Sequence, residues 1–139
     1  MNSLNGTLGI KPGAKVSVVD PPPGFLDKLD PLPQGVELLD AATTGLDVAL
    51  LFVRNPAALL DRLPGVARSL TLRGRLWVCW LTESPPLDEG LVRHVALDIG
   101  MVDDKRASLG SGWLGLRLKW ETRPRAERPG ERRSSIAGS

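Results

Sequence analysis

The stretch "VALLFVRNP", Val48–Pro56, decides the fold class. The part before the arginine is apolar at every position, which is typical of a strand that lies inside a parallel sheet and is covered on both faces. Asn55 and Pro56 then predict the start of a helix, because an asparagine side chain caps the first amides and proline fits the first helical position. A buried strand that leads directly into a helix is the repeating unit of α/β folds.

Similar strands and helices surround this unit. The apolar stretches Val16–Val19 and Leu76–Leu81 are further strand candidates. Apolar residues at helical spacing predict a helix after Asn55, with a kink or a break into two helices at Pro64, since proline lacks the amide that a helix interior needs. The predicted buried stripe of this helix is Leu59, Leu60, Leu63, Val66, Ala67 and Leu70. "DEGLVRHVALDIG" predicts a second helix that ends before Gly100.

The last elements form a predicted hairpin. "MVDDKRAS" and "WLGLRLKW" flank "LGSG", and the charged first arm suits an edge strand, where charge discourages pairing with other chains. Together the elements predict one α/β domain over residues 9–120: a small, mostly parallel Rossmann-like sheet with flanking helices and a C-terminal antiparallel hairpin. "VALLFV" and "RLWVCW" are expected to lie side by side in the middle of this sheet.

One connection is short for such a sheet. "VELLD", Val36–Asp40, is a second strand candidate, and only residues 41–47 separate it from Val48. A parallel crossover usually takes about a dozen residues or more. Either this link is extended, or Val36–Asp40 is not a parallel strand.

Composition and charge exclude several classes of protein. The chain has one cysteine and one histidine, so neither a disulfide framework nor a cluster of cysteine and histidine metal ligands is expected. Its apolar runs are too short to span a bilayer and its first residues do not resemble a signal peptide, so we expect a cytoplasmic protein without membrane contact. The net charge of +2 comes from residues 121–139, where five arginines stand against three glutamates.

This arginine-rich segment, residues 121–139, is expected to be a disordered tail. Its one large apolar residue is Ile136, and burial of so little apolar surface does not offset the entropy lost on ordering. Nucleic-acid binding through the tail is not expected, because its net charge is small and it has no aromatic residues on which bases stack.

Two stretches resemble the class I, S-adenosylmethionine-dependent methyltransferase fold. "GIKPGAKVSVVD" resembles the lead-in and first strand of that fold, and "ARSLTLRGRLWVCW" resembles its later helix end, glycine turn and strand. From "LGIKPG" to "GWLGLRLKW", the chain also resembles a family of small bacterial domains to which no activity is assigned. The first resemblance implies a glycine-rich cofactor loop after the first strand. It also implies an acid after the second strand, here Asp40, that binds ribose hydroxyls.

The chain departs from this pattern in the first loop. Where the fold has glycines whose amides approach the cofactor, this chain has Pro21-Pro22-Pro23 and one glycine, Gly24. Prolines have no N–H to donate. Residues 20–35 leave room for at most two helical turns, and a strand–helix unit is missing between Asp40 and Val48. We therefore expect no bound cofactor, no measurable binding of S-adenosylmethionine at physiological concentrations, and no methyl transfer.

Five residues are candidates for binding. Asp20, Gly24, Asp40 and Arg54 follow predicted strands and are expected near the crevice where open α/β sheets hold ligands. For the two aspartates, hydrogen bonding to their own loops is the competing interpretation. Trp113 begins the last strand on its less apolar face and, if partly exposed, is a candidate for a protein interface. Packing of this tryptophan against a helix is the competing interpretation, and the one we favour.

The sequence leaves two functions open. A non-catalytic, degenerate methyltransferase-like domain, acting as a protein-interaction or regulatory module, is favoured by the proline-filled loop and by the lack of an acid–base constellation. His94, the single histidine, is expected at the solvent boundary, and Cys79 is expected to be buried and inert. The alternative is a small-molecule or nucleotide-binding protein, or a divergent S-adenosylmethionine-dependent methyltransferase, that uses the crevice at the carboxyl edge of the sheet.

Overall fold

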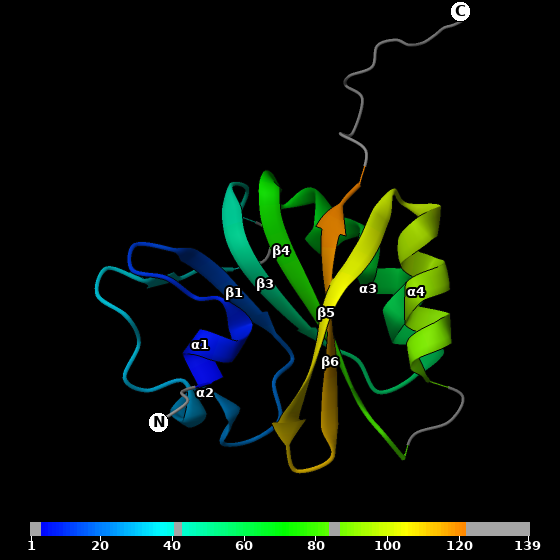
Figure 1. The fold of residues 1–139 in the computed structure, drawn as a ribbon, viewed down its shortest axis with the longest axis horizontal. Coiled ribbons are helices and arrows are strands. Elements are labelled where there is room, and N and C mark those ends of the chain that lie inside the picture. Colours follow the sequence, from blue (N-terminus) through cyan, green and yellow to red (C-terminus); the bar gives the residue numbers. More distant parts are fainter. Residues whose placement is uncertain (1–3, 41–42, 84–86, 122–139) are drawn as a thin grey trace, which may run out of the picture.

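The sheet has six strands in the order β2-β1-β3-β4-β6-β5 in a computed structural model, which describes residues 4–40, 43–83 and 87–121 (Figure 1). The strands are β1 (Lys15–Val19), β2 (Glu37–Leu38), β3 (Leu46–Phe52), β4 (Leu70–Leu81), β5 (Met101–Gly110) and β6 (Trp113–Trp120). The helices are α1 (Leu4–Leu8), α2 (Phe25–Lys28), α3 (Pro56–Arg68) and α4 (Glu89–Asp98). The strands β2, β1, β3 and β4 pair in parallel, and β4, β6 and β5 pair antiparallel, so the predicted fold class is confirmed.

β3 and β4 lie side by side in the middle of the sheet, as predicted. Leu51 of β3 pairs with Val78 of β4, and Val78 pairs in turn with Leu116 of β6. All three side chains are at most 1% exposed. They belong to the core cluster that also contains the buried residues of α3 and α4, the two helices that cover this face of the sheet (Figure 1).

The second strand is parallel, but it is much shorter than "VELLD". β2 pairs with β1 through Lys15 with Glu37 and Val16 with Leu38, and it forms one edge of the sheet. β3 lies on the other side of β1, so the short link passes from one side of β1 to the other. The described residues between β2 and β3 hold no further strand or helix, which agrees with the predicted loss of a strand–helix unit.

α3 begins as predicted and continues through its proline. The Asn55 side-chain oxygen accepts a hydrogen bond from the Ala58 amide at 2.8 Å. Pro64 lies inside the helix, so the alternative of two separate helices is wrong. Two residues of the predicted buried stripe are corrected. Leu60 is 59% exposed, because it faces away from the sheet. Leu70 is buried as predicted, but it belongs to β4 and not to the helix.

α4 and the hairpin also follow the prediction. The Asp88 side chain caps α4 by accepting from the Leu91 amide at 2.8 Å, and Gly100, with φ of 89°, follows the helix end. β5, the charged arm of the hairpin, is the edge strand opposite β2. No helix of the described residues is long and apolar enough to cross a bilayer.

A helix that the sequence did not predict covers part of the other face. α1 is a single short turn, yet Leu8 is 1% exposed and its carbonyl accepts a hydrogen bond from the Trp77 indole at 3.0 Å. α1 and α2 lie on the face opposite α3 and α4 (Figure 1). The packed fold thus begins before residue 9, whereas nearly all of the predicted tail, residues 122–139, lies outside the described residues.

Candidate functional site

The carboxyl edge of the parallel strands carries the residues that the sequence analysis selected. Asp20 follows β1, Asp40 lies two residues after β2, and Arg54 lies two residues after β3. Because these three strands are parallel neighbours, their ends meet at one edge of the sheet. The structure brings two of the three into contact: Arg54 Nη1 donates to the Asp20 carbonyl at 3.2 Å.

Asp20 is held by two arginines. Its backbone is left-handed, with φ of 54°, a conformation that aspartate tolerates better than most residues. Its carboxylate forms an ion pair with Arg62 of α3, and its carbonyl accepts from Arg54. The ion pair is about half exposed, so its contribution to stability is at most about 1 kcal/mol. These contacts favour the interpretation that Asp20 fixes its loop over the interpretation that it binds a ligand.

The loop after Asp20 closes on itself. The Phe25 amide donates to the Pro22 carbonyl at 3.1 Å, and Pro21, Pro22 and Pro23 have no amide hydrogen. Gly24 has a φ of 81°, which a side chain would strain, and no heavy atom lies within 4 Å of the position that its Cβ would take. Glycine is therefore required here by backbone conformation, and open space lies in front of it.

Arg54 also covers an aromatic cluster. Its guanidinium carbon lies 5.5 Å from the centre of the Trp113 ring, which meets Phe52 edge-on at 5.2 Å. Phe25 packs against Phe52 at 4.7 Å. Trp113 is only 8% exposed and belongs to the same core cluster as Phe25 of α2, which favours the interpretation that it packs against a helix over a role in an interface. The sequence pattern did not predict that Arg54 also covers this ring.

Asp40 lies two residues after β2. It is exposed, and its carbonyl accepts a hydrogen bond from the Thr43 amide at 2.9 Å, which starts the link toward β3. Leu38 pairs with Val16 of β1, so Asp40 continues along the edge beside the last residues of β1. Asp40 is thus an exposed residue at the carboxyl edge of the sheet, the position that the resemblance assigns to ribose binding.

Arg62 is the residue of this edge that sequence reasoning missed. It comes from the middle of α3, and its side chain is 44% exposed. An isolated arginine on the polar face of a helix gives no sequence signal of a long-range partner. Only the packing of α3 against the sheet brings it to the loop after β1.

The remaining candidates for chemistry are His94 and groups of side chains that could hold a metal ion. His94 is exposed, as predicted. No group of three histidine, cysteine, aspartate or glutamate side chains among residues 4–40, 43–83 and 87–121 is arranged to hold a metal ion.

Cys79 gives a direct test of the packing of β4. Its side chain is fully buried, and this burial raises the pKa of its thiol because the thiolate loses solvation. We expect iodoacetamide to leave Cys79 unmodified in the native protein at neutral pH and to modify it on addition of urea, as measured by intact mass. Rapid modification without urea would contradict the burial.

Several of the solved structures that this chain resembles are methyltransferases. The chain is similar to a TehB-like SAM-dependent methyltransferase from Corynebacterium glutamicum, with 16% identity and a TM-score of 0.52 over 79% of this chain and 82% of that one. For the ribosomal protein L11 methylase of Lactobacillus delbrueckii subsp. bulgaricus the identity is 13% and the TM-score 0.57, over 84% and 74% of the two chains. For the mitomycin 7-O-methyltransferase MmcR the values are 14% and 0.60, over 78% and 49%. No protein-family model and no curated protein matches the chain. These likenesses establish a class I methyltransferase-like fold.

The cofactor implied by this fold fits the carboxyl edge only in part. S-adenosylmethionine joins an adenosine to a methionine. The exposed carboxylate of Asp40 suits the ribose of the adenosine half, because each of its oxygens accepts hydrogen bonds from hydroxyls. The methionine half does not fit, since Pro21–Pro23 offer its carboxylate no amides and Arg62 already pairs with the Asp20 carboxylate.

Proposed function

We propose that this chain is a small-molecule-binding domain with a methyltransferase-like fold, which binds an adenosine-bearing ligand at the carboxyl edge of its sheet. The observation that carries the proposal is the parallel pairing of β2 with β1, which sets the exposed Asp40 at this edge. A carboxylate that ends a strand of an open α/β sheet is the usual acceptor for ribose hydroxyls. Methyl transfer is not part of the proposal.

In this proposal the protein binds the adenosine half of the ligand and makes no specific contact with the methionine half. Hydrogen bonds from hydroxyls to an ionised carboxylate are among the stronger ones. The amide nest that would hold a second anionic group is replaced by Pro21–Pro23. We therefore expect adenosine and S-adenosylmethionine to bind with similar affinities. The amino-acid half would then add nothing.

The protein-interaction module is the less supported of the two functions that the sequence left open. Its candidate contact was an exposed Trp113, and this side chain is 8% exposed and covered by Arg54. A buried tryptophan offers no surface to a partner. The open space before Gly24 and the exposed carboxylate of Asp40 favour a small ligand instead.

The test is a titration of the protein with adenosine, followed by NMR. We expect a dissociation constant of about 0.1 to 1 mM, because a single carboxylate supplies most of the specific contacts. Asp40→Ala should weaken adenosine binding about tenfold, the value of one charge-assisted hydrogen bond. The same substitution should leave the weaker binding of 2′,3′-dideoxyadenosine unchanged, since that ligand has no hydroxyl for the carboxylate.

Glu37→Ala provides the matched control, because it removes the acidic side chain of another exposed residue, at the start of β2 and three residues before Asp40. Adenosine affinity should be the same in this variant and in the unaltered protein. Equal losses in Asp40→Ala and Glu37→Ala, or equal affinities for adenosine and its dideoxy analogue, would contradict the role of Asp40. An affinity for S-adenosylmethionine far above that for adenosine would show that the methionine half is held after all.

A further inference from the structure

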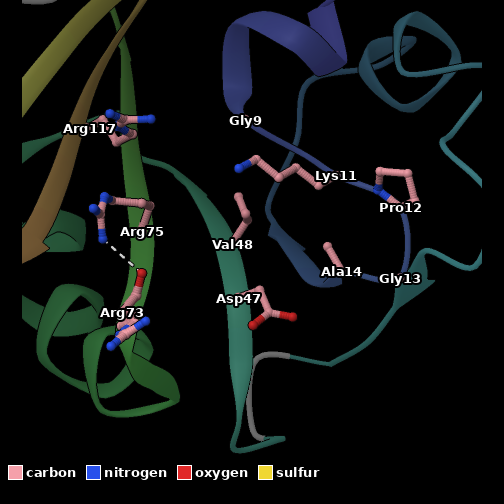
Figure 2. A pocket seen from close by; sticks show the side chains of 10 residues that line it. All are labelled: Gly9, Lys11, Pro12, Gly13, Ala14, Asp47, Val48, Arg73, Arg75 and Arg117. Atoms are coloured by element: carbon pink, nitrogen blue, oxygen red, sulfur yellow. Dashed lines mark hydrogen bonds between the residues drawn. The ribbon is translucent and has the colours of Figure 1, made fainter.

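A pocket lies at the amino edge of the parallel strands, opposite the edge that carries Asp40. It has a volume of about 430 Å³ and is formed by the turn that leads into β1, the start of β3, and cationic side chains of β4 and β6 (Figure 2). This volume is in the range of small-molecule sites. The strands that end near Asp40 begin here, so the two sites are at opposite edges of the sheet.

The walls of this pocket are strongly basic. Lys11, Arg73, Arg75 and Arg117 line it, together with a single carboxylate, Asp47. Asp104 does not line the pocket, but it forms ion pairs with both Arg75 and Arg117. Four cations against these two carboxylates leave a net charge of +2. Like charges in one concave site repel each other, and a bound anion relieves that repulsion.

Many hydrogen-bond donors in the pocket have no acceptor within the described part of the chain. The side chains of Lys11 and Arg73 make no hydrogen bond or ion pair with the described residues. Figure 2 shows the Lys11 side chain pointing across the pocket toward the arginines. Arg117 donates hydrogen bonds to Asp104 from Nε at 2.8 Å and from Nη2 at 3.2 Å, so its Nη1 group is available to a ligand. A ligand with several acceptor oxygens would satisfy these donors.

The backbone keeps the cations in place. Between the pairs Leu46–Leu70 and Val48–Arg75 the register of β4 shifts against β3, which forms a bulge before Arg75. Gly74 lies in this bulge, where an added Cβ would be 2.9 Å from the Leu46 carbonyl oxygen. Arg75 Nη1 donates to the Arg73 carbonyl at 2.7 Å, so its guanidinium is fixed within the bulge. Bulges of this kind commonly re-aim side chains at functional sites.

We propose that this basic pocket, lined by Lys11, Arg73, Arg75 and Arg117, binds a small molecule through a phosphate or polyphosphate group. Arginine forks and a lysine ammonium are the side chains that recognise phosphate oxygens. None of the residues that line the pocket is aromatic, so it offers no surface on which a base could stack. The pocket therefore selects the phosphate end of its ligand, which favours a small phosphorylated molecule over a nucleic acid.

The experiment is a calorimetric titration with inorganic pyrophosphate at low ionic strength. We expect saturable binding with one pyrophosphate per chain. The double substitution Lys11→Gln and Arg73→Gln should weaken it at least about tenfold, because two charge-assisted contacts are lost. Neither side chain has a partner in the described fold, so the variant should keep its melting temperature.

Arg106→Gln is the control for loss of a positive charge outside the pocket. Arg106 is 62% exposed on β5 and pairs with Glu89, away from the pocket. This variant should bind pyrophosphate within about twofold of the unaltered protein, since only long-range charge is removed. Asp40→Ala should also leave pyrophosphate binding unchanged, which separates this proposal from adenosine binding at the other edge.

Three results would overturn the proposal. The first is no saturable binding of pyrophosphate up to about 5 mM, an affinity too weak for a built site. The second is an equal loss in Arg106→Gln and in the double variant, which would indicate general attraction of anions to a basic surface. The third is tight binding of a single-stranded oligonucleotide that pyrophosphate does not displace, which would assign the surface to nucleic acid instead.

Discussion

Val78→Asp is expected to abolish cooperative folding of the domain. Val78 is 0% exposed and pairs with Leu51 on one side and Leu116 on the other, in the middle of the sheet. An aspartate there would place an unpaired carboxylate in an apolar core, at a cost of more than about 3 kcal/mol out of a typical total stability of about 5–15 kcal/mol. Urea unfolding followed by circular dichroism measures the loss in the free energy of unfolding.

Leu72→Asp is the control for this substitution on the same strand. Leu72 is 54% exposed near the start of β4, so a charge there remains in water. Its free energy of unfolding should change by less than about 1 kcal/mol. If Val78→Asp unfolded at the same urea concentration as the unaltered protein, the central position of β4 would be wrong.

Trp77→Ala should produce the second-largest loss of stability. Trp77 is 0% exposed between the sheet and α1, and its indole nitrogen donates to the Leu8 carbonyl at 3.0 Å. Truncation removes a large apolar side chain and leaves that carbonyl without its donor. We expect the free energy of unfolding to fall by about 3–5 kcal/mol, as for other buried aromatic residues changed to alanine.

Trp77→Phe and Trp120→Ala separate the contributions to this loss. Trp77→Phe keeps most of the apolar volume but not the donor, so its loss should be intermediate. Trp120 is only partly buried at the end of β6, and its truncation should cost less than about 2 kcal/mol. If Trp77→Ala lost no more than Trp120→Ala, the packing of α1 on the sheet would be contradicted.

Local sequence patterns predicted the longer strands and the helices that begin with a capping side chain. "VALLFV" became β3 because an all-apolar run is stable only where both faces are covered, and Asn55 capped α3 as its type predicts. α1 could not be predicted, because a helix of one turn carries no periodic pattern and is held by Trp77, far away in the sequence. Leu60 was misplaced since it lies at the margin of the helical stripe, where spacing does not decide exposure.

The candidate site was predictable as far as strand ends determine it. Asp20, Asp40 and Arg54 reach one edge because parallel strands end together. The ion pair of Asp20 with Arg62 and the cover that Arg54 gives to Trp113 depend on how α3 and the hairpin pack. The basic pocket could not be predicted either, because its residues come from β3, β4, β6 and the turn before β1, and only the pairing of these strands brings them together.

A crystal structure of the protein with adenosine would test the central claim most directly. We predict that the nucleoside lies at the carboxyl edge, with its ribose hydroxyls within hydrogen-bonding distance of the Asp40 carboxylate. Part of the nucleoside should fill the open space at Gly24. A nucleoside found in the pocket of Lys11 and Arg73, or one bound at the carboxyl edge without contact to Asp40, would contradict it.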